Sequence, residues 1–161
     1  MPSFKGLILS KLPAVGTTIF TVMSKLATEH KAINLSQGFP DFNCSDELLD
    51  LVNKYMRAGM NQYAPMQGVP ALRESISEMM EGLYGMKYDP ETEINITAGA
   101  TQAIYTAIAA LVRDGDEVII FEPAYDCYGP AVEMNGGRAV YVQLKQPDFS
   151  IDWNVVKKMI N

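Results

Sequence analysis

The chain has 161 residues, of which 48% are apolar and 20% charged, so it is long enough and apolar enough to bury the core of a globular domain. Its net charge of −6, without any basic block, argues against nucleic acid and anionic membranes as partners. Two cysteines and one histidine indicate neither a disulfide framework nor a metal site, and they favour a reduced, cytoplasmic setting.

The N-terminal part of the chain predicts a helix and then a short strand. The only apolar run at the start, residues 6–9, is too short for a signal peptide or a membrane span. Apolar side chains recur at helical spacing within residues 14–30, with Thr17 or Thr18 as a possible N-cap. From Ala32 the sequence indicates a short strand that gives way to a loop at Gly38.

Two more helices are predicted before residue 86. Ser45 is a good N-cap for the first, acidic residues occupy its first turn, and Gly59 ends it. The second covers residues 71–85, because its apolar side chains fall on one face. The proline- and glycine-rich stretch between the two helices is expected to be irregular.

Strands and helices alternate from residue 94 to residue 144. This pattern predicts an α/β fold, with a mostly parallel sheet and helices on both of its faces. The expected strands are 94–98, 117–121 and 138–143, and the expected helices are 100–112 and 125–135. Another helix begins at Asp152. Three strands are fewer than the roughly five or six of an average sheet, so we expect the chain to be part of a longer protein.

The junction at Gly99 is the strongest candidate for a binding site. A helix that begins just after a strand offers unpaired N–H groups and the positive end of its dipole, which suits a phosphate. Gly99 would let a ligand approach the backbone, Ala100 is small, and Thr101 adds a hydroxyl group. The alternative is an ordinary tight turn with a threonine cap. The sequence contains neither a P-loop nor a dinucleotide-binding glycine motif.

Tyr125 follows the next predicted strand, at the edge of the sheet where ligands of open α/β folds bind. An aromatic ring there could stack on a flat ligand. The alternative is a surface tyrosine that packs on its own helix. Together with the Gly99 junction, Tyr125 predicts a ligand that is both phosphorylated and planar.

Four segments give the sequence a recognisable resemblance: INLSQGFPDF, NQYAPMQGVPALRE, ITAGATQAIYTAI and GDEVIIFEPAYDCYGPAVEMNGG. In this order and spacing they resemble class I/II aminotransferases of the fold-type I pyridoxal-phosphate family, in the branch of the methionine, kynurenine and glutamine transaminases. The resemblance covers the whole chain, although chains of this family are usually more than twice as long.

The resemblance implies pyridoxal 5'-phosphate as cofactor. Ala100 and Thr101, after Gly99, would hold the cofactor phosphate through backbone N–H groups, and Tyr125 would stack on the pyridine ring. It further implies a domain division into an N-terminal arm and small-domain segment, residues 1–45, and the first part of the large cofactor-binding domain, residues 46–161.

Two more roles are implied by the resemblance. Gly38 would lie at the substrate carboxylate, and Tyr63 would reach the cofactor phosphate of the other subunit, so that a homodimer shares its sites. From the residues alone, Gly38 could equally be a turn glycine, and Tyr63 a partly buried loop tyrosine.

No catalytic residue is expected within the chain. None of its nine lysines lies in the serine-rich turn that carries the Schiff-base lysine of the family, and we expect that lysine beyond Asn161. The 161-residue chain alone is therefore expected to be inactive.

The resemblance implies a transaminase that moves the amino group of an apolar or aromatic amino acid, such as methionine, to a 2-oxo acid. Two alternatives stay open: a C–S β-lyase of the same fold, and a non-catalytic fragment that dimerises or binds phosphate.

Overall fold

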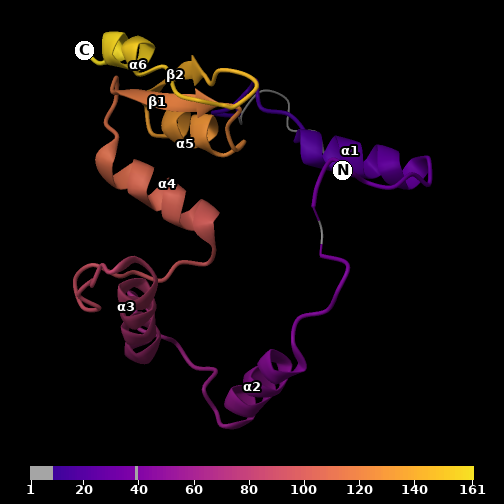
Figure 1. Cartoon of the computed structure of the whole chain (residues 1–161), viewed down its shortest axis with the longest axis vertical. Coiled ribbons are helices and arrows are strands. Elements are labelled where there is room, and N and C mark those ends of the chain that lie inside the picture. Colours follow the sequence, from indigo (N-terminus) through magenta and orange to yellow (C-terminus); the bar gives the residue numbers. More distant parts are fainter. Residues whose placement is uncertain (1–8, 39) are drawn as a thin grey trace. The chain divides into compact units, whose positions relative to one another are not determined.

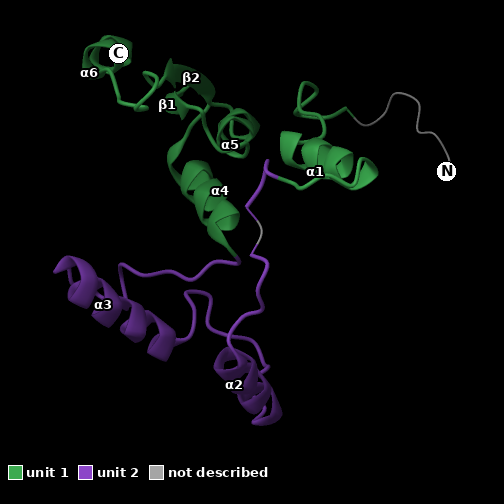
Figure 2. Cartoon of the chain, turned by 45° about the vertical axis from the view of Figure 1, so that its right-hand side comes forward, with its two compact units in different colours: residues 1–34, 99–161 green, residues 35–98 purple. Residues whose placement is uncertain are grey.

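A computed structural model of the chain describes residues 9–38 and 40–161 (Figure 1). The chain divides into two compact units (Figure 2). The first unit comprises residues 1–34 and 99–161, and the second unit comprises residues 35–98. These units follow contacts within the chain, and the expected domain division at residue 45 stays a prediction.

A two-stranded parallel sheet forms the centre of the first unit. Strand β1, Glu117–Glu122, pairs with β2, Arg138–Gln143, and Glu117 lies opposite Arg138. The helix α5, Tyr128–Met134, connects them. Both strands are almost continuous apolar runs, as expected where each face is covered. The predicted parallel pairing of these strands is confirmed, and β1 extends one residue further than predicted.

Helices lie on both faces of this sheet. Successive residues of a strand point to opposite faces. Ile120 is buried on the face that α5 covers, where Val132 of that helix is fully buried. The Phe121 ring points the other way and meets the edge of Trp153, with 6.5 Å between ring centroids. Trp153 opens the helix α6, Trp153–Met159, so α5 and α6 enclose the strands from opposite sides (Figure 1).

Two further helices complete the first unit. Helix α4, Ala100–Leu111, begins at the predicted junction and packs against α5. Helix α1, Ile19–Glu29, lies within the predicted range of residues 14–30. Of the two threonines proposed as its cap, Thr18 fills the role, because its Oγ1 accepts a hydrogen bond from the N–H of Thr21 at 3.4 Å.

The second unit contains the helices α2, Asp46–Arg57, and α3, Pro70–Tyr84. As predicted, Ser45 caps α2, and its Oγ accepts a hydrogen bond from the N–H of Leu48 at 3.3 Å. Helix α3 ends at Gly85, whose φ of 67° lies in the left-handed region that glycine adopts without strain.

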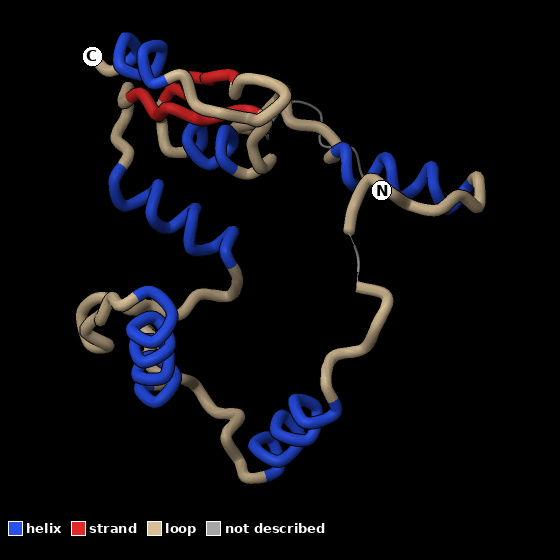
Figure 3. Tube along the Cα trace, viewed as in Figure 1, coloured by secondary structure: helices blue, strands red, loops and turns tan. Residues whose placement is uncertain are grey.

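Two strand predictions were wrong. Neither residues 94–98 nor the segment from Ala32 to Gly38 forms a strand, and Figure 3 draws both as loop. A strand needs a partner for its backbone groups along its length. Among the described residues of its own unit, segment 94–98 has one such backbone bond, from the N–H of Ile96 to the carbonyl of Gln67 at 2.9 Å. One isolated bond does not make a ladder.

Helix α5 is shorter than predicted. It begins at Tyr128 rather than at Tyr125, because residues 125–128 form a turn in which the Tyr128 N–H donates to the Tyr125 carbonyl at 3.3 Å. The turn leaves Tyr125 outside the helix, on a loop directly after β1.

Asp152 fixes the start of α6. Its Oδ1 accepts hydrogen bonds from the N–H groups of Asn154 at 3.0 Å and Val155 at 3.3 Å, and its Oδ2 lies 2.9 Å from Lys145 Nζ. The hydrogen bond from Lys145 and then that from the Val155 N–H hold the pKa of Asp152 below its ordinary value. The ionised carboxylate therefore favours the folded state.

Asp152→Ala is expected to lower the melting temperature at pH 7. Because the folded-state pKa of Asp152 lies below the unfolded value, its contribution is present above the unfolded pKa of about 4 and is lost as the pH falls through the folded pKa. The gap between wild type and variant should close below about pH 4 in thermal unfolding at several pH values. Asp152→Asn, which keeps one side-chain oxygen, is the control. A gap that does not change with pH would contradict the prediction.

Candidate functional site

The junction before α4 requires glycine. Gly99 is the N-cap of the helix, with φ of 96° and ψ of 164°, a conformation that only glycine adopts without strain. Apart from its chain neighbours, no described residue lies within 4 Å of the position that a Cβ would occupy there. The lack of a Cβ at Gly99 would let a ligand approach the backbone at this position.

The first turn of α4 is suited to an anion. No side chain caps the helix, and the turn contains no acidic residue. Among the described residues, none accepts a hydrogen bond from the N–H groups of Ala100 and Thr101. These donors carry the positive end of the helix dipole. Such donors fit a phosphate group, and phosphate binding at Ala100 and Thr101 stays a prediction.

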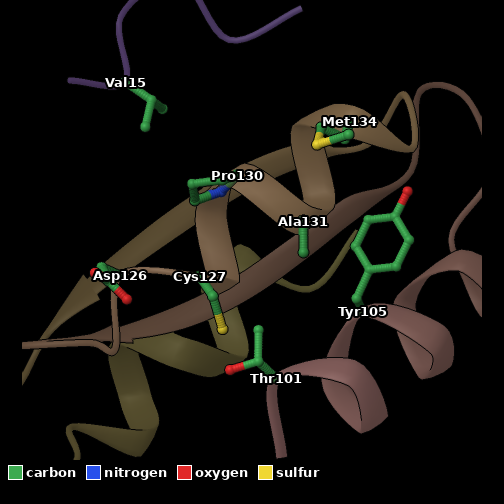
Figure 4. Close-up of a pocket in the computed structure, with 8 residues that line it drawn as sticks. All are labelled: Val15, Thr101, Tyr105, Asp126, Cys127, Pro130, Ala131 and Met134. Atoms are coloured by element: carbon green, nitrogen blue, oxygen red, sulfur yellow. The ribbon is translucent and has the colours of Figure 1, made fainter. Parts of the chain in front are cut away.

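A hollow of about 300 Å³ lies beside this turn, between α4 and α5 (Figure 4). Thr101 and Tyr105 line it from α4, while Cys127 and Ala131 line it from the start of α5. The remaining lining residues are Val15, Asp126, Pro130 and Met134. The hollow joins the start of α4 to the loop that follows Tyr125, so two of the predicted site segments meet within the first unit.

The thiol in this hollow is not set up as a nucleophile. Burial raises the pKa of Cys127, and the nearby charge of Asp126 raises it further. Both effects favour the neutral thiol, which reacts poorly. Within the described ranges, no group of acidic, histidine and cysteine side chains could hold a metal ion. The described residues around the hollow therefore provide neither a reactive thiolate nor a metal site.

Tyr125 belongs to an aromatic cluster in the first unit. Its ring lies 6.1 Å from that of Tyr128, edge to face, and 6.5 Å from that of Phe20 of α1. Tyr125 therefore packs on the first residue of α5, which is close to the alternative interpretation of a surface tyrosine packed on its own helix, although Tyr125 itself precedes α5. Even so, Tyr125 remains 51% exposed, which leaves ring surface for a planar ligand. Phe20 could not be found from the sequence, because only tertiary packing brings α1 to this loop.

The other two candidate residues lie in the second unit. Tyr63 is in the irregular segment between α2 and α3 and is fully exposed, so it is not the partly buried loop tyrosine of the alternative interpretation. Gly38 is also exposed. Apart from its chain neighbours, no described residue lies within 4 Å of the position of a Cβ at Gly38, so Tyr63 does not pack there.

Comparison with known proteins gives consistent matches. The profile of the family described as "Aminotransferase class I and II" matches residues 30–161. The chain is 55% identical over 144 residues to a methionine aminotransferase of Escherichia coli (strain K12), and the match covers 89% of this chain and 37% of that protein. It is 38% identical over 143 residues to human kynurenine–oxoglutarate transaminase 1, covering 88% of this chain and 34% of that protein.

A solved structure resembles this chain in its fold as well as in its sequence. The crystal structure of an Escherichia coli protein, for which a methionine aminotransferase function was identified, superposes with a TM-score of 0.92 at 51% identity. The match covers 96% of this chain and 41% of that one. The chain thus spans well under half the length of the relatives it matches.

Proposed function

The chain belongs to the class I and II aminotransferases, and from this premise we propose that the whole protein is a pyridoxal-phosphate-dependent aminotransferase. It moves the amino group of an apolar or aromatic amino acid, methionine being the first choice, to a 2-oxo acid. The observation that carries the proposal is the first turn of α4, which has no side-chain cap and no acidic residue and lies beside the loop of Tyr125. The similarity to a methionine aminotransferase supports the choice of donor.

The phosphate of the cofactor binds at the start of α4. The N–H groups of Ala100 and Thr101 donate to its oxygens, and the Thr101 hydroxyl can add a further bond. Gly99 keeps the space beside them free of a Cβ. Since the first turn contains no carboxylate, nothing there repels the phosphate charge.

Tyr125 orients the pyridine ring by stacking, and its own orientation is restricted by the edge contact with Tyr128. When bound, pyridoxal phosphate supplies an electron-withdrawing ring that stabilises negative charge at the α-carbon of the substrate. The residues of this chain bind and align the group, and none of them is assigned a proton transfer.

The second unit contributes the remaining two roles. The exposed backbone at Gly38 lies at the substrate carboxylate, and Tyr63 donates its hydroxyl to the cofactor phosphate of the partner subunit. The active protein is accordingly a homodimer with shared sites. We place it in the cytoplasm, because both cysteines are unpaired. None of the described helices has the length and apolar character of a membrane span.

The proposal predicts that ¹⁵N-labelled methionine transfers its label to a 2-oxo acid. The whole protein, loaded with pyridoxal phosphate, is incubated with labelled methionine and 2-oxoglutarate, and the products are identified by mass spectrometry. Labelled glutamate is expected, and no product should form when the 2-oxo acid is omitted. Free ammonia and pyruvate from a cysteine S-conjugate, without transfer from methionine, would identify a β-lyase instead. No turnover of either donor would favour a non-catalytic protein.

A further inference from the structure

Helix α3 buries a polar face in the second unit. Its two buried residues are Arg73, which is 4% exposed, and Ser77, which is 5% exposed. They are four residues apart and therefore lie on the same side of the helix. Burying a guanidinium costs free energy unless its N–H groups donate hydrogen bonds. The acceptors of these bonds therefore show which segments Arg73 connects.

Arg73 joins two segments that flank α3 in sequence. Its Nε donates to the carbonyl of Gly68 at 3.2 Å, on the segment before the helix. After the helix, Nη1 donates to the carbonyl of Pro90, and Nη2 lies 3.2 Å from Glu91 Oε1. The Glu91 side chain is 72% exposed, so this ion pair contributes little, and the two carbonyl bonds carry the connection.

Ser77 makes a separate connection. Its Oγ donates to the carbonyl of Tyr88, on the segment after the helix. It has no bond to the segment before α3. The two buried residues of α3 therefore differ in one respect: only Arg73 reaches residues 65–68.

Residues 65–68 form the end of the loop that carries Tyr63. The Gly68 N–H closes a turn onto the Pro65 carbonyl at 2.8 Å, and the Gln67 carbonyl accepts from the Ile96 N–H at 2.9 Å. Gly68 is buried with φ of 102°, and a Cβ there would stand 2.3 Å from Cγ1 of Ile96. This end of the loop is thus held closely, whereas the Tyr63 side chain is fully exposed and has no packing of its own.

We propose that Arg73 is a positioning residue for Tyr63: its guanidinium holds residues 65–68 against the segment after α3 and so fixes where the Tyr63 hydroxyl is presented. The inference rests on the proposed function, in which that hydroxyl binds the cofactor phosphate of the partner subunit. Lysine cannot replace arginine, because a single ammonium cannot span the Gly68 and Pro90 carbonyls as a planar fork does.

The test compares the affinity of the apo dimer for pyridoxal phosphate in four forms: wild type, Tyr63→Phe, Arg73→Lys and the double variant. Arg73→Lys is expected to weaken binding roughly five- to tenfold, a loss comparable to that of one hydrogen bond. The double variant should bind no more weakly than Tyr63→Phe alone, since a mispositioned phenylalanine has no hydroxyl to lose.

Ser77→Ala is the matched control. It removes a buried bond from the same face of α3 but leaves residues 65–68 in place. It should lower the melting temperature and leave the affinity for pyridoxal phosphate unchanged. If Arg73→Lys does not give a folded dimer, Gly68→Ala replaces it, because the clash of the new Cβ with Ile96 displaces the same loop. The affinity for pyridoxal phosphate is then compared among Gly68→Ala, Tyr63→Phe and their double variant.

Three results would overturn the inference: unchanged affinity in Arg73→Lys, losses that add in the double variant, or an equal loss in Ser77→Ala. A different result would count against the proposed role of Tyr63 itself: Tyr63→Phe alone would then bind pyridoxal phosphate as tightly as wild type.

Discussion

Replacing Ala100 with proline is expected to weaken the binding of pyridoxal phosphate by about 10- to 150-fold. The change removes one backbone N–H from the start of α4, and a hydrogen bond to a charged group contributes about 1.5–3 kcal/mol. The measurement is titration of the apo dimer with the cofactor, followed by its absorbance.

The backbone at this position accepts proline without distortion. Ala100 is the first residue of α4, a position where proline is common because its missing N–H has no partner in the helix. The ψ of 164° at Gly99 is close to the range that a following proline favours. A loss of affinity would therefore report the missing donor rather than a broken helix.

Ala100→Ser is the matched control for this experiment, since it keeps the N–H and adds little volume. Its affinity should stay close to that of wild type, and circular dichroism should show the same helix content in both variants. Wild-type affinity in Ala100→Pro would show that the phosphate does not bind at the start of α4.

Tyr63→Phe is expected to weaken binding of the cofactor by about 5- to 100-fold, because it removes one hydroxyl donor to a charged phosphate, worth roughly 1–3 kcal/mol. The side chain is fully exposed, so the substitution should not change the stability of the fold. The same titration measures the affinity, and thermal unfolding checks the stability.

A heterodimer decides whether Tyr63 acts on the partner subunit. One subunit carries Tyr63→Phe and the other carries Ala100→Pro. If Tyr63 acts across the interface, one site has both defects and the other has neither, so the dimer keeps one site of wild-type affinity. If it acts within its own subunit, each site has one defect and no wild-type site remains. The number of high-affinity sites per purified heterodimer gives the answer.

Local sequence signals determined several features of both units. The apolar runs at β1 and β2 predicted their parallel pairing, because a strand covered on both faces has no polar side. Ser45 was identified as a cap from its side chain, and the cap of α1 was narrowed to Thr17 or Thr18, since a cap bonds the backbone only two or three residues away. The candidate phosphate site at Gly99 was visible for the same reason: a helix start after glycine is a local feature.

Features that depend on distant partners could not be determined from the sequence. Residues 94–98 are as apolar as a strand, yet they have no ladder within their unit, and the pattern does not show which backbone groups find partners. The placing of Phe20 beside Tyr125 likewise depends on how α1 packs within its unit.

Arg73 illustrates the limit most clearly. By its position on an amphipathic helix it resembles an ordinary surface cation, because nothing near it in the sequence indicates burial. Only the folded chain brings the carbonyls of Gly68 and Pro90 to its guanidinium and removes it from water. The sequence thus determined the helix caps and the apolar character of β1 and β2, which depend on neighbouring residues. The tertiary structure alone decided which polar groups are buried, because burial depends on residues far apart in the chain.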